Sequence, residues 1–240
     1  MIVEKMQPMQ QAVVVTGAGR RLGAQLCRSL LAGGFPVIGC YHSMTDEVAA
    51  LSASGALMLH ADLADDAGVT DVVAQVRRSA VSLRAVIHNA SVWYSDDVLM
   101  QDPALLAATY ALHVFTPHRL NEAWHDLLTA SGQGHIVFLT DANVPRGKAD
   151  RSLYLASKAA MESLMRSHAR KWAPAIQVNA IAPGLLAFHA DDDVEYRRQR
   201  LSHSLLGIEP GFDTVVEAVH FLLQNCYINA SVLTLDGGRQ

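Results

Sequence analysis

Seven short apolar runs alternate along the chain with longer segments of helical periodicity, and this alternation most constrains the fold. The runs are mostly apolar and do not alternate strictly with polar residues, as expected of strands that are buried on both faces of a sheet. Strands separated by helices form a parallel sheet with helices on both sides. We therefore predict an α/β fold, a single-domain Rossmann fold whose doubly wound parallel sheet has about seven strands. The predicted strands cover residues 12–16, 35–40, 56–60, 83–88, 135–140, 176–181 and 232–235.

The segments between these runs carry apolar residues at helical spacing, and several are followed by Gly or Pro. No internal repeat or linker divides the chain, so we predict one Rossmann-type domain over residues 12–240, after a flexible N-terminal extension of residues 1–11. The least regular stretch, residues 183–210, predicts a lid or a substrate loop. The predicted helices cover residues 22–32, 44–54, 66–79, 103–130, 152–172 and 212–225.

The composition narrows the choice of partners. The chain has 240 residues, 50% of them hydrophobic, which is enough for a large core. A net charge of -4 argues against nucleic acid or an anionic membrane surface as the main partner. No segment is long and apolar enough to span a bilayer, and the three cysteines show no disulfide or zinc-binding spacing. We therefore predict a cytoplasmic protein that binds a small molecule.

The first predicted strand runs into a glycine-rich turn at residues 16–23 and then into a helix. Glycines at such a turn let the backbone approach a pyrophosphate at the helix N-terminus. An ordinary glycine-rich turn is the alternative, but the strand before it and the amphipathic helix after it favour a dinucleotide site. The predicted cofactor contacts in this turn are Gly17, Arg20, Arg21, Leu22 and Gly23.

The second predicted strand ends without the acidic residue that binds the ribose 2′-hydroxyl of NAD. Arg20 or Arg21, together with His42 and Ser43, can instead meet a 2′-phosphate, which favours NADPH. The alternative is that these arginines are solvated surface charges.

Two further strand ends fit the same cofactor. After the third strand, Asp62 can accept a hydrogen bond from the adenine amino group while Leu63 covers the ring, although Asp62 can equally be a helix N-cap. After the fourth strand, Asn89, Ala90 and Ser91 stand at the carboxyl end of a central strand, where open α/β sheets bind ligands.

Tyr154 and Lys158 are four residues apart, which places them on one face of a predicted helix. The ammonium can stabilise the phenolate and bring the pKa of the tyrosine towards the working pH, which suits an acid in a reduction. Asp141, at the end of the fifth apolar run, is the candidate for a third catalytic group. The alternative is a pair of exposed helix residues, because such spacing is common by chance.

Together these residues resemble the short-chain dehydrogenase/reductase family from Ala12 to Gly238. The family's glycine motif corresponds to residues 16–23, its Asn-Ala segment to residues 89–90, and its active-site pair to Tyr154 and Lys158. The resemblance implies that Lys158 also holds the nicotinamide ribose, and that Pro183, Gly184 and Leu185 line the nicotinamide. It also implies a homotetramer paired through the helices of residues 103–130 and 152–172.

Three departures from the family's pattern narrow the function. Arg21 replaces the middle glycine, Asp141 replaces the catalytic serine, and His113 stands where a helix asparagine is usual. The first two are shared with the pteridine reductases of the family. The resemblance extends to residues 88–93 and 191–197, and it implies NADPH-dependent reduction of 7,8-dihydromonapterin to 5,6,7,8-tetrahydromonapterin, with weaker action on dihydrofolate.

A pterin needs an aromatic face and hydrogen-bonding groups on its rim. Trp93 can supply the face, with Ser91 and Arg21 as rim contacts, unless Trp93 is a core aromatic. Asp141 and Tyr154 are the candidate proton sources. Asp141 would either have its pKa raised by burial or pass protons from water.

Other interpretations stay open at this point. His113 is either a hydrogen-bonded core histidine or a support for a water near Lys158. The run Asp191–Asp193 lacks partner ligands, so we predict a solvated loop and no metal. The rival functions are an NADPH-dependent carbonyl reductase of the 3-oxoacyl-thioester type and a non-catalytic NADP-binding protein.

Overall fold

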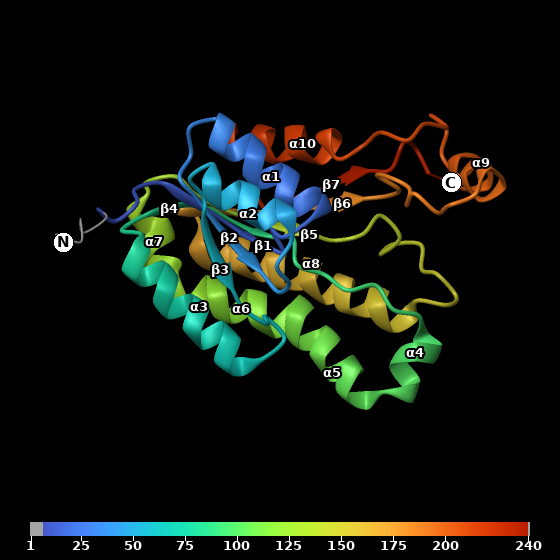
Figure 1. The fold of residues 1–240 in the computed structure, drawn as a ribbon, viewed down its shortest axis with the longest axis horizontal. Helices are drawn as coiled ribbons and strands as arrows, with labels where there is room; N and C mark the ends of the chain where they lie inside the picture. The colour runs from blue at the N-terminus through green and yellow to red at the C-terminus, as the bar shows by residue number, and fades with distance from the viewer. Residues whose placement is uncertain (1–6, 240) are drawn as a thin grey trace.

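The computed structural model describes residues 7–239, and its seven strands form one parallel sheet (Figure 1). The strand order is β3-β2-β1-β4-β5-β6-β7, so the chain winds outward in both directions from the centre of the sheet. This confirms the predicted fold class. The strands are β1 (Ala12–Thr16), β2 (Val37–Tyr41), β3 (Leu57–His60), β4 (Leu83–His88), β5 (Gly134–Leu139), β6 (Ile176–Pro183) and β7 (Val232–Leu235).

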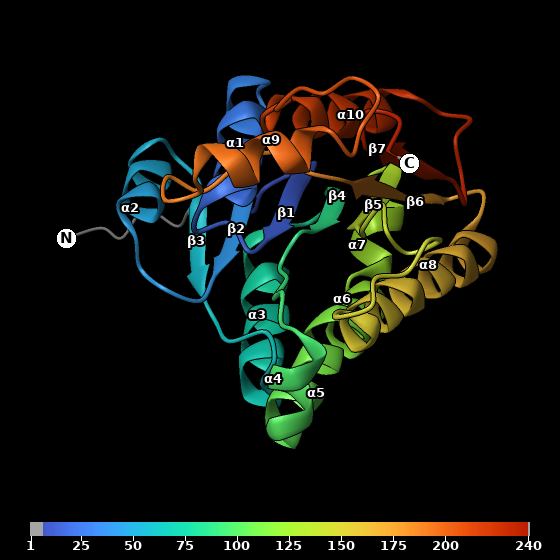
Figure 2. The same cartoon turned by 90° about the vertical axis from the view of Figure 1, so that its right-hand side faces the viewer.

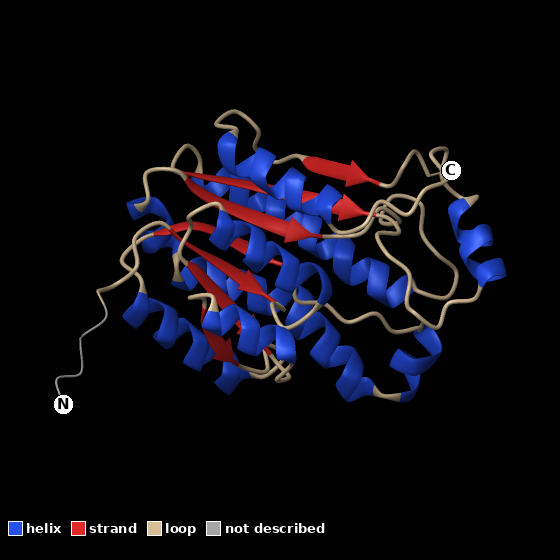
Figure 3. Cartoon of the chain, turned by 45° about the horizontal axis from the view of Figure 1, so that its top comes forward, coloured by secondary structure: helices blue, strands red, loops and turns tan. Residues whose placement is uncertain are grey.

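Helices cover both faces of the sheet (Figure 1). One face carries α1 (Arg21–Ala32), α2 (Asp46–Ala53) and α10 (Asp213–Gln224). The other carries α3 (Asp66–Ser79), α6 (Thr116–Ala123), α7 (His125–Ala130) and α8 (Ser152–Trp172). The remaining helices, α4 (Asp96–Gln101), α5 (Pro103–Tyr110) and α9 (Val194–Leu201), project past the carboxyl ends of the strands (Figure 3). Among residues 7–239, every helix is either too short or too polar to cross a membrane.

Two apolar clusters pack against the sheet, one on each face. On the α6 and α8 face, Leu120, Trp124 and Phe138 are fully buried. On the α1 and α10 face, Leu26 and Val219 are fully buried. The central strands are therefore covered on both sides, which is why their sequences are apolar without alternation.

The structure divides the predicted 103–130 helix into four pieces. Between α5 and α6 lies a π-helical segment, η1 (Ala111–Phe115), and α7 begins after a break at Trp124. Pro117 lies in the first turn of α6 and has no N–H to donate to the carbonyl four residues earlier, so the regular α ladder is interrupted there. A continuous helix was therefore a wrong prediction.

The segment 183–210, predicted to be irregular, contains α9. The carboxylate of Asp193 caps this helix and accepts a hydrogen bond of 2.7 Å from the Tyr196 amide. No residue of α9 is buried, so its sequence lacks the apolar stripe from which a helix can be predicted.

The described residues before β1 form hydrogen bonds with the rest of the domain. The Met9 amide donates to the Ser79 carbonyl at 2.7 Å, and the Gln11 side chain donates to the Ser131 carbonyl at 2.9 Å. The prediction of a flexible extension covers residues 1–11, but residues 9–11 are held by these hydrogen bonds. Residues 1–6 lie outside the described part of the chain.

Candidate active site

The glycine turn between β1 and α1 is packed too closely for any side chain. A Cβ on Gly17 would lie 2.8 Å from Cα of Ala90, and one on Gly23 would lie 2.0 Å from the Gly17 carbonyl oxygen. The Asn89 amide donates to the carbonyls of Thr16 and Gly17, both at 3.0 Å. Among the described residues, no side chain caps the N-terminus of α1, so its first N–H groups remain available. The turn therefore fits a pyrophosphate.

The two arginines of this turn lie near different parts of the chain. Gly19, which precedes Arg20, lies close to the loop after β2, since a Cβ on Gly19 would be 3.4 Å from the Ser43 carbonyl oxygen. Arg21 has a left-handed backbone with φ of 49°, and its guanidinium lies 3.1 Å from His189 Nδ1. Arg21 is therefore directed to the segment 183–210, and Arg20 stays the candidate for a 2′-phosphate.

Arg21 is exposed, but its guanidinium has partners other than water. Besides His189, its guanidinium donates to the Ala187 carbonyl at 3.3 Å and lies 5.4 Å from the ring centroid of Phe212. Arg21 thus holds the segment 183–210 against the glycine turn. In Figure 2, α9 of this segment lies in front of α1, over the carboxyl ends of the strands.

The structure of the loop after β3 distinguishes between the two roles considered for Asp62, a contact with adenine and a helix N-cap. The N-cap of α3 is Asp65, whose carboxylate accepts hydrogen bonds from the amides of Ala67 and Gly68. The N-cap interpretation of Asp62 is therefore wrong. The Asp62 side chain is about half exposed, and Oδ2 lies 3.9 Å from His42 Nε2. Leu63, in contrast, is buried in the core beneath this loop.

Asp141, Tyr154 and Lys158 come together at the carboxyl end of β5. The Tyr154 hydroxyl donates to Asp141 Oδ2 at 3.3 Å, and the Lys158 ammonium donates to the Leu139 carbonyl at 2.9 Å. Tyr154 is 6% and Lys158 2% exposed, so the alternative of an exposed helix pair is wrong. The ammonium lies 5.7 Å from the Tyr154 ring centroid.

In this structure, burial and Asp141 rather than Lys158 set the shift in the pKa of Tyr154. Burial and then the neighbouring Asp141 carboxylate raise the pKa of Tyr154 above its ordinary value. Burial lowers the pKa of Lys158 to about 8, against the opposing effect of Asp141. Because desolvation and a like charge both favour the neutral form, the phenol stays protonated at neutral pH.

Asp141 is oriented by Asn143, a residue that the sequence interpretation did not include. Asp141 Oδ1 accepts two hydrogen bonds of 2.7 Å, one from the Asn143 backbone amide and one from its side-chain amide. This turn directs Oδ2 towards Tyr154. Aspartate side chains often accept a hydrogen bond from the backbone amide two residues further along, which forms a turn. The Asp-Ala-Asn sequence could therefore have indicated this contact.

His113 is a fully buried, hydrogen-bonded histidine on η1, the first of its two interpretations. The Val92 amide donates to Nε2 at 3.3 Å, so Nε2 is the acceptor nitrogen and Nδ1–H donates to Ser157 Oγ at 2.8 Å. Burial, and then the charge of Lys158, lowers the pKa of His113 to about 2, so the imidazole is neutral. His113 therefore connects the loop after β4 to the helix of Tyr154.

Trp93 lies on the surface, and the interpretation as a core aromatic is wrong. Its side chain is 57% exposed. The guanidinium of Arg151 lies 4.2 Å and the ammonium of Lys148 5.2 Å from the ring centroid. Neighbouring Ser91 Oγ is 3.0 Å from His113 Nε2. The two cations, which sequence reasoning missed, hold Trp93 near the start of α8.

A family model described as enoyl-(acyl carrier protein) reductase matches residues 17–240. The chain belongs to the short-chain dehydrogenase/reductase family. A dihydromonapterin reductase of Enterobacter sp. (strain 638) is 38% identical over 96% of this chain and 97% of that protein. Another, from Escherichia coli O6:K15:H31 (strain 536 / UPEC), is 39% identical over 98% of both.

The family relationship extends to solved structures. FolM alternative dihydrofolate reductase 1 from Brucella canis, solved in complex with NADP, is 31% identical to this chain. The similarity has a TM-score of 0.85 and covers 95% of this chain and 93% of that one. This short-chain dehydrogenase/reductase therefore shares both fold and sequence with relatives named for pterin and folate reduction.

The last predicted cofactor residues lie at the same edge of the sheet. Pro183 ends β6, and the Gly184 amide donates to the Leu235 carbonyl at 2.8 Å. A Cβ on Gly184 would approach Asp236 to 3.1 Å. Leu185 is partly buried beside them. In this reductase, Pro183, Gly184 and Leu185 thus share the carboxyl edge of the parallel sheet with Asn89 and Asp141.

Proposed function

We propose that this chain reduces 7,8-dihydromonapterin to 5,6,7,8-tetrahydromonapterin with NADPH, and that it reduces dihydrofolate more slowly. The observation that carries this proposal is the contact between Tyr154 and Asp141, which puts a carboxylate where the family resemblance places a serine. The names of the relatives support a dihydropterin as substrate. The NADP complex of the Brucella canis relative supports the cofactor.

The glycine turn and the strand ends fit a dinucleotide. The free N–H groups at the start of α1 would bind the pyrophosphate, and Arg20 with His42 and Ser43 would bind the 2′-phosphate. Lys158 would hold the nicotinamide ribose. Bound NADPH supplies the hydride.

The substrate side of the site offers groups that suit a pterin. The exposed ring of Trp93 offers an apolar surface, and Ser91 offers a hydroxyl at the end of β4. Arg21 has five N–H donors, and its contacts with His189 and Ala187 leave others for the rim of the ring.

Reduction of an imine adds a hydride to carbon and a proton to the neighbouring nitrogen. Tyr154 is protonated at neutral pH and its hydroxyl is directed at Asp141, so the pair holds one proton at the site. We propose that this proton reaches the substrate nitrogen from the pair, and that Asp141 then receives a replacement from solvent through its partly exposed side.

The test is NADPH oxidation by the purified protein with 7,8-dihydromonapterin, dihydrofolate, dihydrobiopterin and an acetoacetyl thioester, each compared with NADH. We expect the highest kcat/KM with dihydromonapterin and NADPH. Turnover of the thioester alone would favour carbonyl reduction, and cofactor binding without any turnover would favour a non-catalytic protein. Either result overturns the proposal.

We also propose a homotetramer that pairs through the helices of residues 103–130 and 152–172, as the family resemblance implies. Sedimentation equilibrium tests this, with an expected mass four times that of the chain. A monomer at working concentrations would contradict it. The cytoplasmic location stays a prediction.

A further inference from the structure

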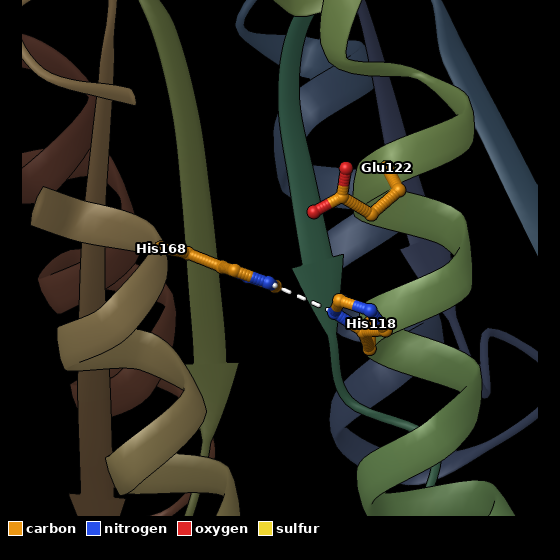
Figure 4. A group of neighbouring side chains, drawn as sticks. All are labelled: His118, Glu122 and His168. Carbon is orange, nitrogen blue, oxygen red and sulfur yellow. Dashed lines mark hydrogen bonds between the residues drawn. The ribbon is translucent and has the colours of Figure 1, made fainter. Parts of the chain in front are cut away.

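Three side chains with metal-ligating chemistry meet between α6 and α8, far from Tyr154. His118 and Glu122 are on α6, and His168 is on α8 (Figure 4). His168 follows Tyr154 by fourteen residues on the same helix, about 21 Å at the rise of an α-helix. This cluster is therefore separate from the candidate active site.

The spacing of the three groups is close to that of a metal site. His118 Nδ1 lies 3.1 Å from His168 Nε2, and these atoms and a Glu122 oxygen all lie within 4.8 Å of one another. Two nitrogens bound to a tetrahedral zinc ion at their usual bond lengths are about 3.3 Å apart. His118 and Glu122 are one helical turn apart and so share a face of α6. Little movement is needed for all three to bind one ion.

The buried ligand is held in place by a second layer of contacts. His168 is 2% exposed, and its ring packs against Trp172 with 4.2 Å between centroids. Its Nδ1 lies 3.3 Å from Asn121 Nδ2, and Asn121 Oδ1 lies 2.8 Å from His88 Nε2. A half-turn of the amide exchanges its oxygen and nitrogen, after which Asn121 can accept the Nδ1–H of a metal-bound His168. Such outer contacts orient the histidines of metal sites.

We propose that His118, Glu122 and His168 bind one zinc ion, whose fourth ligand would be a water molecule. Two imidazoles and one carboxylate are ligands that zinc accepts, whereas calcium and magnesium prefer oxygen. In the single chain, His118 and Glu122 are exposed and line a groove of about 440 Å³ between α3 and α6. A bound ion would join α6 to α8, helices that cover the same face of the sheet.

Lys171 is the competitor for this site. Its ammonium lies 2.5 Å from Glu122 Oε1, so the carboxylate already has a cationic partner. Zinc must share or displace this contact. Removing the lysine should therefore tighten zinc binding, an effect that a cluster held only by hydrogen bonds and an ion pair would not produce.

The test is calorimetric titration of Zn²⁺ into the intact, chelator-treated protein, together with the visible spectrum of Co²⁺ in its place. We expect one ion per chain and the absorption bands of tetrahedral Co²⁺. His118→Ala and Glu122→Gln, both at exposed positions, should weaken binding about tenfold or more. Lys171→Met should strengthen it several-fold. His220→Ala, on α10 across the sheet, is the matched control and should bind as the parent does.

The outcomes are decisive in both directions. Circular dichroism of each variant establishes that it is folded, and zinc should raise the midpoint of thermal unfolding for the parent but not for His118→Ala. Failure to bind at micromolar zinc, or equal loss in the His220→Ala control, overturns the proposal. Unchanged affinity in both ligand variants overturns it as well. Because these readouts do not use turnover, they are independent of the proposed reductase activity.

Discussion

The Tyr154 hydroxyl donates its hydrogen bond to Asp141 Oδ2 at 3.3 Å, not to a group on its own helix. Lys158, one turn further along α8, donates instead to the Leu139 carbonyl. The phenol therefore faces a carboxylate in a buried setting, and both effects raise its pKa. The pair therefore holds a proton at neutral pH, and imine reduction consumes one proton.

Asp141→Asn should lower kcat/KM for dihydropterin reduction about a hundredfold or more, because general acid catalysis contributes about 10² to 10⁴ in rate. Tyr154→Phe should have a loss of the same order. Steady-state kinetics with 7,8-dihydromonapterin measures both, and the double variant should be little worse than either single one. If Asp141→Ala leaves the rate intact while Tyr154→Phe abolishes it, Asp141 only binds the substrate or supports the structure of the site.

Activity should fall as the pH rises through about 8, because Lys158 loses its charge near that value.

The same shift in the pKa of Lys158 also predicts how the stability of the protein depends on pH. Because the pKa of Lys158 is lower in the folded state, the folded protein binds fewer protons at this lysine than the unfolded chain does. The contribution of Lys158 to the free energy of unfolding therefore rises with pH between about 8 and the lysine's ordinary pKa of 10.5. Urea unfolding at neutral and alkaline pH, compared between the parent and Lys158→Met, should show that rise only in the parent.

His113→Ala should destabilise the protein by about 2 to 4 kcal/mol, because it leaves a cavity and removes partners from Val92 and Ser157. Phe115→Ala is the matched control, since it lies on the same π-helical segment but is 61% exposed, and it should change stability by only about 0.5 kcal/mol. Denaturant unfolding measures both. Equal losses of stability in the two variants would show that the stability depends on the π-helical segment η1 and not on the contacts of His113.

Arg20→Ala should raise the KM for NADPH about tenfold to a hundredfold and leave the KM for NADH nearly unchanged, because one charge-assisted contact to phosphate is lost. Arg28→Ala is the control, as this arginine of α1 pairs with Glu47 on the surface. Arg21→Ala should act on the KM for the pterin instead, since Arg21 holds the segment that carries α9. A larger cofactor effect from Arg21 than from Arg20 would reverse this assignment.

Trp93→Ala should raise the KM for the dihydropterin about tenfold, whereas Trp93→Phe should retain most of the affinity, because an aromatic contact contributes about 1 kcal/mol beyond its buried area. The side chain is exposed, so neither change should lower the thermal midpoint markedly. Calorimetric titration of the pterin in the presence of NADP⁺ gives the affinities directly. Identical affinities for the two variants would remove Trp93 from the site.

Much of the fold follows from local pattern. The strand β1 is apolar from Ala12 to Val15 because it has a strand on either side and helices on both faces. The turn of Gly17 and Gly23 is readable because no other residue fits against Ala90 and the Gly17 carbonyl. The short helix α9 was missed for the opposite reason, since it buries no side chain and leaves no periodic signal.

The sequence by itself determined the parallel sheet, the glycine turn and the helical spacing of Tyr154 and Lys158, because each depends on neighbours within one or two elements. Only the tertiary structure decided that Tyr154 faces Asp141, that Lys158 turns to Leu139, and that Asp65 and not Asp62 caps α3. It also brought His118 within 3.1 Å of His168, fifty positions away. These outcomes depend on burial and on hydrogen-bond partners from distant segments, and neither is present until the helices pack onto the sheet.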